Sequence, residues 1–448
     1  MMREFKKMVT NYVRAFYYLQ NMLRNAYWDY EKLINYQNKK LKKIIQYAYN
    51  NVPFYHYYFK KNGIRPEDIK NSKDLNKLPI IRKNDIRNNY EDFISKEFKK
   101  RNLITISTSG SSGKPLYLHI SQAEDEFRKA KHLRANISLG QKPRDRWVII
   151  TSPHHFGTST KIQRFFNLYV PTPISVFDDV SIQLFKIERF KPKILDGYSS
   201  SLLLLAKEVE KRKKGYDQLK FIIGGSELID IGSRHFIESV FDVPFYDQYA
   251  CIEFERIAWQ CPEKVGYHMD FDSLVLQFVD QDNEVSSGES GEIICTSLFN
   301  YAMPLIRYAT GDAGIQSDEK CSCGRRLPLM KVVEGRTDSF LYFPNNRVMS
   351  PRAFTVAMST FKDYAYIDQF RIVQKEIDHI IVFIKLKNNL REEAVFSRNL
   401  CDYLRRTLSL DMDNVLIEIK FVDNIPLDKT GKLMMVVSEL DKSKTAYA

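Results

Sequence analysis

The sequence has no long uninterrupted apolar run and few cysteines. None of its 448 residues belongs to a stretch of about 18 consecutive apolar residues, the length that a membrane span needs. Charged residues interrupt the segment 1–20, so it lacks the apolar core of a secretory signal peptide. Six cysteines are too few for a disulfide scaffold in a chain of this length. We therefore expect a cytoplasmic protein with no transmembrane segment.

The net charge of +13 comes from 68 Lys and Arg against 55 Asp and Glu. These charges are spread along the chain, and no basic arm or nucleic-acid-binding motif accompanies them, so we expect no nucleic-acid partner. Hydrophobic residues make up 44% of the chain, which is typical of a globular protein. The length predicts two or three units, one of them large.

The first hundred residues have a helical pattern. Leu41, Ile44, Ile45 and Ala48 follow helical spacing, with lysines between them. The segment 1–35 is amphipathic and rich in aromatic residues. Two interpretations remain open for it: a helix docked on its own domain, or a surface for a membrane face or a partner.

Short apolar runs then alternate with helical patterns, which predicts an α/β core. Trp147–Thr151 and Phe221–Ile223 are expected to be buried strands, and Leu202–Val209 a helix. In the last hundred residues, strands are expected at 370–374, 379–386 and 415–422, with one helix at 391–408. We expect a large domain over 1–336 and a small α+β domain over 338–448.

A loop rich in serine and glycine is the clearest sign of a site. Five hydroxyl side chains and two glycines fall within the nine residues 107–115. Glycines let successive backbone N–H groups turn toward an anion, and the lysine adds positive charge, so the loop predicts phosphate binding. Two residues separate the glycines and proline follows the lysine, unlike the P-loop of NTPases. The candidate ligands are Thr108, Ser109, Gly110, Ser111, Ser112, Gly113 and Lys114.

Five further motifs follow in order along the chain. They are Gly224-Gly-Ser-Glu227, Asp247-Gln-Tyr-Ala-Cys-Ile-Glu253, Tyr308-Ala-Thr-Gly-Asp312, Gly335-Arg-Thr-Asp338 and Pro426-Leu-Asp-Lys-Thr-Gly-Lys432. Each is weak alone, but their order and spacing are specific. Together with the segments 47–55 and 78–83, they resemble the adenylate-forming superfamily of acyl-CoA synthetases and nonribosomal adenylation domains. The resemblance covers about residues 35–440 and is greatest to the phenylacetate–coenzyme A ligase branch, in particular its capsular polysaccharide biosynthesis members.

The resemblance implies a large adenylation domain with a small mobile domain, and it assigns roles to individual residues. The serine-rich loop would hold the β- and γ-phosphates of ATP, and Glu253 would help to hold Mg²⁺. Asp338 would be the hinge of the small domain, and Lys432 the lysine that this domain brings in for adenylation. The other implied nucleotide-binding residues are Gly224, Gly225, Ser226 and Glu227 beside adenine, Tyr249 stacked on it, Asp312 on the ribose, and Arg336.

The chemistry itself explains why such residues are needed. A carboxylate that attacks the α-phosphate brings two anions together, and Mg²⁺ and Lys432 would offset that repulsion. The chain departs from the family at Ala250 and Ile252, where a glycine and a hydroxyl residue usually precede the glutamate. It also has Asn345-Asn346 where relatives carry a glycine that admits the coenzyme A arm.

The cysteines near the middle of the chain suggest a metal site. Cys321 and Cys323 form a C-x-C pair, and Cys261 and His268 lie upstream. Three thiols and one imidazole suit tetrahedral Zn²⁺, and the resemblance also implies a structural zinc in this branch. The alternative is a group of buried thiols with an ordinary histidine.

Three functions are compatible with these observations. The first is an acyl-CoA ligase that uses ATP, a small-molecule carboxylate and coenzyme A. In the second, the acyl group passes from the adenylate to an amine or a sugar during surface-polysaccharide biosynthesis. The third is a non-catalytic scaffold in that pathway. His154 and His155 are candidates for the acyl pocket, although a pair of histidines more often belongs to an ordinary loop. A homodimer is a possible assembly.

Overall fold

The protein was analysed as a computed structural model. It describes all residues except 1, 109–115, 158, 160, 214, 337–339, 345–346, 388–392, 411–414, 429–431 and 441–448. The chain divides into two compact units, and each is built from several segments. Unit 1 comprises 1–144, 160–169 and 246–333, and unit 2 comprises 145–159, 170–245 and 334–448.

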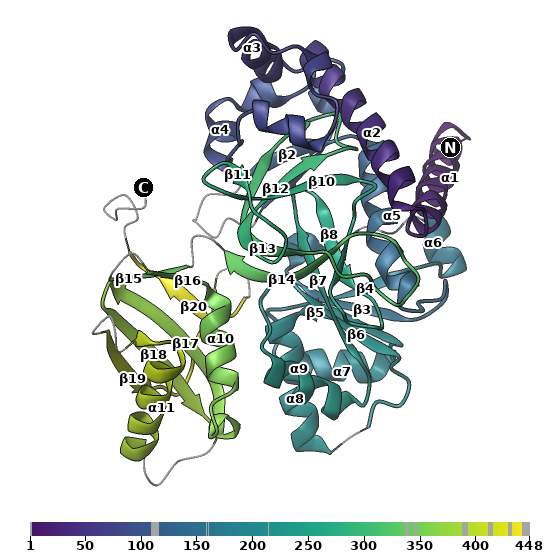
Figure 1. Ribbon diagram of the computed structural model, residues 1–448. Helices are drawn as coiled ribbons and strands as arrows, with labels where there is room; N and C mark the ends of the chain where they lie inside the picture. The colour runs from purple at the N-terminus through teal and green to yellow at the C-terminus, as the bar shows by residue number, and fades with distance from the viewer. Residues whose placement is uncertain are drawn as a thin grey trace. The chain divides into compact units, whose positions relative to one another are not determined.

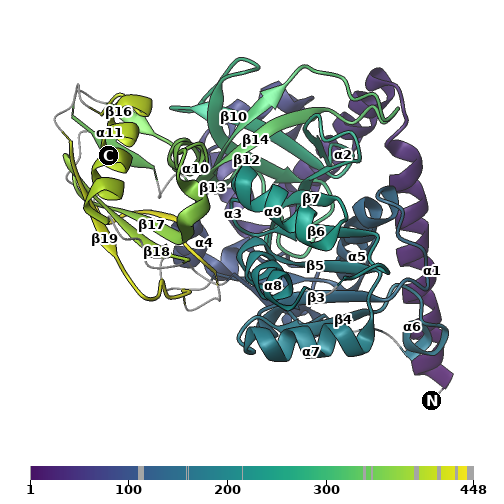
Figure 2. The ribbon, with the colours of Figure 1, turned by 90° about the horizontal axis from the view of Figure 1, so that it is seen from below.

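Unit 1 begins with helices, as the sequence predicts. They are α1 (Met2–Asn25), α2 (Tyr30–Asn51), α3 (Pro53–Lys61), α4 (Lys83–Asn88), α5 (Gln122–Ser138) and α6 (Lys161–Phe166). The predicted apolar positions of α2 are completely buried, because they fall on one face of the helix. Helix α1 lies alongside α5 (Figure 2), and buried Leu19 and Met22 pack there against Ala130. Phe16 and Tyr17 of α1 are exposed. Docking of this helix is thus confirmed, while these two aromatic side chains stay open to solvent.

The strands of unit 1 follow. They are β1 (Ile104–Ser107), β2 (Tyr117–Ile120), β7 (Phe245–Cys251), β8 (Glu255–Gln260), β9 (Tyr267–Met269), β10 (Leu274–Asp280), β11 (Asn283–Glu284), β12 (Ser290–Ser297), β13 (Tyr308–Ser317) and β14 (Leu329–Arg336). β1 and β2 form an antiparallel pair. The others lie side by side in the order β11-β10-β12-β13-β14-β9-β8-β7. One apolar core joins them to α2 and α3.

Unit 2 contains a parallel sheet covered by helices. Its elements are β3 (Trp147–Thr151), β4 (Pro171–Ser175), α7 (Val180–Phe190), β5 (Ile194–Tyr198), α8 (Ser199–Arg212), β6 (Phe221–Gly225) and α9 (Ile231–Phe241). The strands pair in the order β6-β5-β3-β4, all parallel. Helices α7, α8 and α9 lie together against this sheet (Figure 1) and share its apolar core. This alternation confirms the predicted α/β class.

The last hundred residues form the predicted α+β unit, with an apolar core of their own. The elements are β15 (Leu341–Phe343), β16 (Arg347–Met349), α10 (Pro351–Ser359), β17 (Ile367–Glu376), β18 (His379–Leu386), α11 (Glu393–Thr407), β19 (Leu416–Phe421) and β20 (Val436–Ser438). Four strands pair in the order β19-β18-β17-β20. The expected hinge residue, Asp338, lies outside the described residues, so the domain boundary stays a prediction. Among the described helices, none combines the length and apolar character needed to cross a bilayer.

Candidate adenylation site and candidate metal centre

Glu253 lies in the turn between β7 and β8 and is almost completely buried, with 4% of its surface exposed. The Tyr308 hydroxyl donates a hydrogen bond of 2.7 Å to Glu253 Oε1. The ammonium group of Lys83 lies 3.7 Å from the same oxygen. An isolated buried carboxylate would be costly, and these two partners compensate the charge. Glu253 therefore offers a fixed carboxylate oxygen, the kind of ligand atom that Mg²⁺ prefers.

A second fixed carboxylate belongs to β13. The Tyr249 hydroxyl donates hydrogen bonds to Asp312 Oδ2 at 2.7 Å and to Thr310 Oγ1 at 3.2 Å. Burial, reinforced by the Asp312 carboxylate, raises the pKa of Tyr249 well above its usual value, so this hydroxyl remains a donor. Tyr249 and Asp312 are thus brought together, as expected for residues of one site. The stacking of Tyr249 on adenine stays a prediction.

The base of the serine-rich loop is closed by two hydrogen bonds. The Thr108 amide donates to the Leu116 carbonyl at 2.9 Å, and the Leu116 amide donates to Thr108 Oγ1 at 3.1 Å. The two strands on either side of the loop, β1 and β2, are antiparallel. Ser109, Gly110, Ser111, Ser112, Gly113 and Lys114 lie outside the described residues.

In unit 2, β6 ends at Gly224 and Gly225, as the sequence predicts for a loop at the carboxyl end of a parallel strand. Ser226 follows with a left-handed φ of 67°. Glu227 is held by two backbone amides: Ser200 donates to Oε2 at 2.8 Å, and Leu433 donates to Oε1 at 2.7 Å. Burial raises the pKa of Glu227, and these amides oppose that shift.

The bond from Leu433 places the neighbouring Lys432 near the end of β5. The ammonium group of Lys432 lies 5.5 Å from the ring centroid of Tyr198, a cation–π distance. The Lys432 amide donates to Asp428 Oδ1 at 2.9 Å, and the Asp428 amide donates to the Lys432 carbonyl at 2.8 Å. These bonds fix the backbone of Lys432 against Asp428. The side chain of Arg336 is not described, although its backbone belongs to β14.

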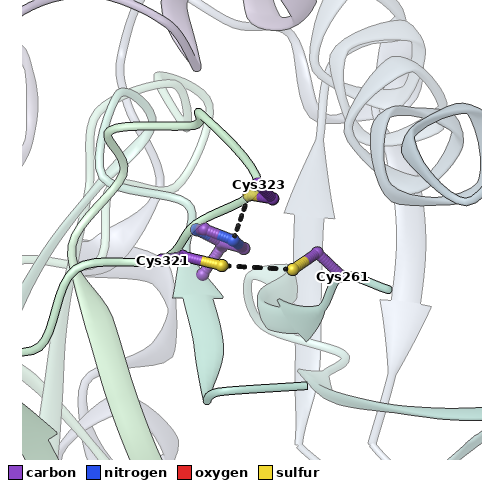
Figure 3. Close-up of side chains that lie close together, drawn as sticks. Cys261, Cys321 and Cys323 are labelled. Carbon is purple, nitrogen blue, oxygen red and sulfur yellow. Dashed lines mark hydrogen bonds between the residues drawn. The ribbon is translucent and has the colours of Figure 1, made fainter. Parts of the chain in front are cut away.

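The predicted metal ligands form one cluster. The ligand atoms of Cys261, His268, Cys321 and Cys323 all lie within 4.8 Å of one another. The Cys261 and Cys321 sulfurs face each other at 3.4 Å (Figure 3), and Cys323 Sγ lies 3.3 Å from His268 Nε2. All six cysteines of the chain are free thiols.

The chemistry of this cluster fits zinc. With Zn–S bonds of about 2.3 Å, tetrahedral ligand atoms would lie about 3.8 Å apart, which requires only a small adjustment of the observed spacing. The ring nitrogen Nδ1 of His268 faces the Leu327 carbonyl at 3.4 Å, so Nε2 is left for a metal. Burial lowers the pKa of His268 to about 4, which keeps the imidazole neutral, as ligation requires. Cys261 and His268 are completely buried, so the site would be closed to substrate.

Several contacts of these sites were not predicted from the sequence. Tyr308, the first residue of the Tyr308-Ala-Thr-Gly-Asp312 motif, binds Glu253, and Tyr198 lies beneath Lys432. Of the proposed acyl-pocket residues, His155 is half-buried at the end of a short helical turn after β3, and the side chain of His154 is not described. Their role stays a prediction.

Comparisons with known proteins agree with this arrangement. Residues 347–439 match the family model of the CapK C-terminal domain. Phenylacetate-coenzyme A ligase of Thermus thermophilus is 25% identical over 325 residues, which are 69% of this chain and 72% of that protein. Protein CapK of Staphylococcus aureus is 24% identical over 424 residues, which are 91% of this chain and 90% of that protein.

A crystal structure of 2-hydroxyisobutyryl-CoA ligase in complex with 2-HIB-AMP matches with a TM-score of 0.77 at 17% identity. The match covers 93% of this chain and 91% of that one, and at this identity it shows the fold alone. The relatives confirm the resemblance to AMP-forming acid ligases of the adenylate-forming superfamily, and the structural match confirms the fold. The chain is similar to phenylacetate-coenzyme A ligases over about two thirds of its length and to CapK over nearly its whole length.

Proposed function

We propose that the protein activates a small carboxylic acid with ATP as an acyl-AMP and then transfers the acyl group. The observation that carries this proposal is the pair of fixed carboxylates, the buried Glu253 and the half-buried Asp312. Each is fixed by a tyrosine hydroxyl at 2.7 Å. Both lie in motifs for which the resemblance implies contacts to the nucleotide or its metal ion. A preorganised site of this kind needs little rearrangement when the substrate binds.

The residues have distinct roles in this proposal. Glu253 would hold Mg²⁺, which neutralises phosphate charge when it is bound. Asp312 would accept hydrogen bonds from the ribose hydroxyls. Lys432 would stabilise the charge that develops at the α-phosphate. Glu227 orients Lys432 through the bond from the adjacent Leu433 amide. The serine-rich loop at 108–114 and Arg336 would bind the phosphates, and Asp338 would be the hinge.

We propose coenzyme A as the acyl acceptor, since the phenylacetate-coenzyme A ligases among the relatives carry that acceptor in their names. A second acceptor class is an amine or a sugar in surface-polysaccharide biosynthesis. The resemblance to the capsular polysaccharide biosynthesis members of the branch motivates this second class. The Asn345-Asn346 turn, on which access for coenzyme A would depend, lies outside the described residues.

The test is to supply ATP, a panel of acids and either coenzyme A or amino sugars, and to identify the products by mass spectrometry. A thioester together with AMP would establish the coenzyme A ligase. An amide or ester would establish the second acceptor class. ATP binding without AMP formation under any condition would reject both and would favour a non-catalytic scaffold.

We also propose a structural Zn²⁺ at Cys261, His268, Cys321 and Cys323. Cys261 directly follows β8, His268 lies in β9, and the other two ligands precede β14, so the metal would fix these strands to one another. Metal analysis of protein purified without chelator should give about one zinc per chain. A zinc content near zero in stable protein would reject the site.

A further inference from the structure

Lys83 is held in a defined position by the strand that carries Tyr308 and Asp312. The Ile81 amide donates to the Arg307 carbonyl at 2.9 Å, and the Ala309 amide donates to the Ile81 carbonyl at 2.9 Å. This forms a parallel bridge between the segment 78–83 and β13. The Arg307 guanidinium also donates to the Leu78 carbonyl at 2.6 Å. The segment therefore moves with the strand.

The two neighbouring basic residues point to different partners. Arg82 makes a two-pronged ion pair with Glu292, with both N–O distances 2.9 Å. Lys83, the first residue of α4, turns toward Glu253 instead. The Lys83 side chain is 25% exposed, whereas that of Glu253 is 4% exposed. A ligand that enters beside Glu253 can thus reach the lysine.

The distance from Lys83 Nζ to Glu253 Oε1 shows what kind of contact the two side chains make. At 3.7 Å they form an ion pair but not a hydrogen bond, so this contact uses none of the three ammonium N–H donors. An ammonium group with available donors, fixed beside a predicted magnesium ligand, is suited to phosphate oxygens. Glu253 keeps the cation in place before any nucleotide arrives, because Coulomb attraction persists beyond hydrogen-bond range.

We propose that Lys83 binds the β- and γ-phosphates of ATP and stabilises the pyrophosphate that leaves. The proposal rests on the adenylation function proposed above. In that step, a carboxylate oxygen of the acid forms a bond to the α-phosphorus. The bond from the α-phosphorus to the bridging oxygen of the β-phosphate breaks, and its electron pair stays with pyrophosphate. The Lys83 ammonium would balance that added charge without transferring a proton.

The test compares the binding of ATP, pyrophosphate and AMP by titration calorimetry, in the full-length protein with Mg²⁺. In Lys83→Ala, the dissociation constants of ATP and pyrophosphate should rise about 10- to 100-fold, the loss typical of one charged hydrogen bond. AMP, which has no β- or γ-phosphate, should bind as in the wild type. Lys83→Arg should recover most of the ATP affinity. Arg82→Ala, whose side chain pairs with Glu292 instead, is the matched control and should bind all three ligands normally.

Three results would overturn the proposal, and they are distinguishable. Unchanged ATP and pyrophosphate binding in Lys83→Ala would remove the phosphate role. An equal loss of affinity for ATP and AMP, together with a lower melting temperature of the unliganded variant, would mean that Lys83 only stabilises the position of Glu253. If the wild type itself binds no ATP, the adenylation function fails, and the inference about Lys83 fails with it. Selective loss of ATP and pyrophosphate binding supports the proposal.

Discussion

Replacement of Gly224 by alanine tests how closely the end of β6 is packed. A Cβ atom built on Gly224 would lie 2.0 Å from Cζ of Phe245 and 2.7 Å from its Cε2. Non-bonded carbon atoms pack at about 3.5–4.0 Å, so the ring would have to move by about 1.5 Å. Phe245 is completely buried in the core of unit 2 and has little room to move. We expect a loss of about 3 kcal/mol in the free energy of unfolding, the upper end for overpacking.

The assay is urea unfolding, with two variants for comparison. A Cβ on Gly157 would meet nothing within 4 Å, so Gly157→Ala should change stability by less than about 0.5 kcal/mol. Phe245→Leu should recover part of the loss in the Gly224→Ala background, because the ring that clashes is gone. The two changes should therefore couple by about 1 kcal/mol or more. If Gly224→Ala is as stable as Gly157→Ala, or if Phe245→Leu only adds to its loss, the packing argument is wrong.

Three other changes test separate parts of the account. Lys432→Ala should reduce the adenylation rate on the order of 10²–10³-fold, and near-normal pyrophosphate release would contradict its role. Cys323→Ser should lower both the zinc content and the melting temperature. Adding a chelator should then lower the melting temperature of the variant little further. Equal zinc content in the wild type and the variant would argue against ligation by Cys323. Burial alone would raise the pKa of Glu255, but His132 and Arg128 lower it to about 2. A lowered pKa stabilises the fold above the usual value near 4.5, so stability should fall between about pH 4.5 and pH 2. Glu255→Gln should reduce this dependence of the unfolding free energy on pH. The same fall between about pH 4.5 and pH 2 in the variant as in the wild type would refute the role of Glu255.

Local sequence patterns predicted most of the fold because the helices and strands are regular. Their apolar faces extend over enough residues to show a helical or a strand periodicity in the sequence. The strand expected at 379–386 has those bounds in the structure, and the helix expected at 202–209 lies within α8. The parallel order of β3, β5 and β6 is a long-range property, and only the alternation of strands and helices indicated it. The tertiary association of the Cys/His set was also predictable, because its ligand chemistry is specific.

The partners of the candidate carboxylates could not be predicted in the same way. Tyr308 and Lys83 come to Glu253 from distant parts of the chain, and neither stands in a pattern that names its partner. A tyrosine or a lysine side chain can bind many different partners, so the residue type alone does not identify the partner. The contact of Glu227 with the Leu433 amide could not be predicted from the sequence either. Its donor is a backbone amide, which does not depend on the type of the residue.

The most direct test of the central claim is carboxylate-dependent exchange between ATP and labelled pyrophosphate, without any acyl acceptor. The assay should use a panel of aryl, fatty, hydroxy and amino acids with the wild type and Lys432→Ala. We predict exchange with one class of acid and a loss on the order of 10²–10³-fold in the variant. No exchange with any acid, while ATP still binds, would contradict the adenylation activity.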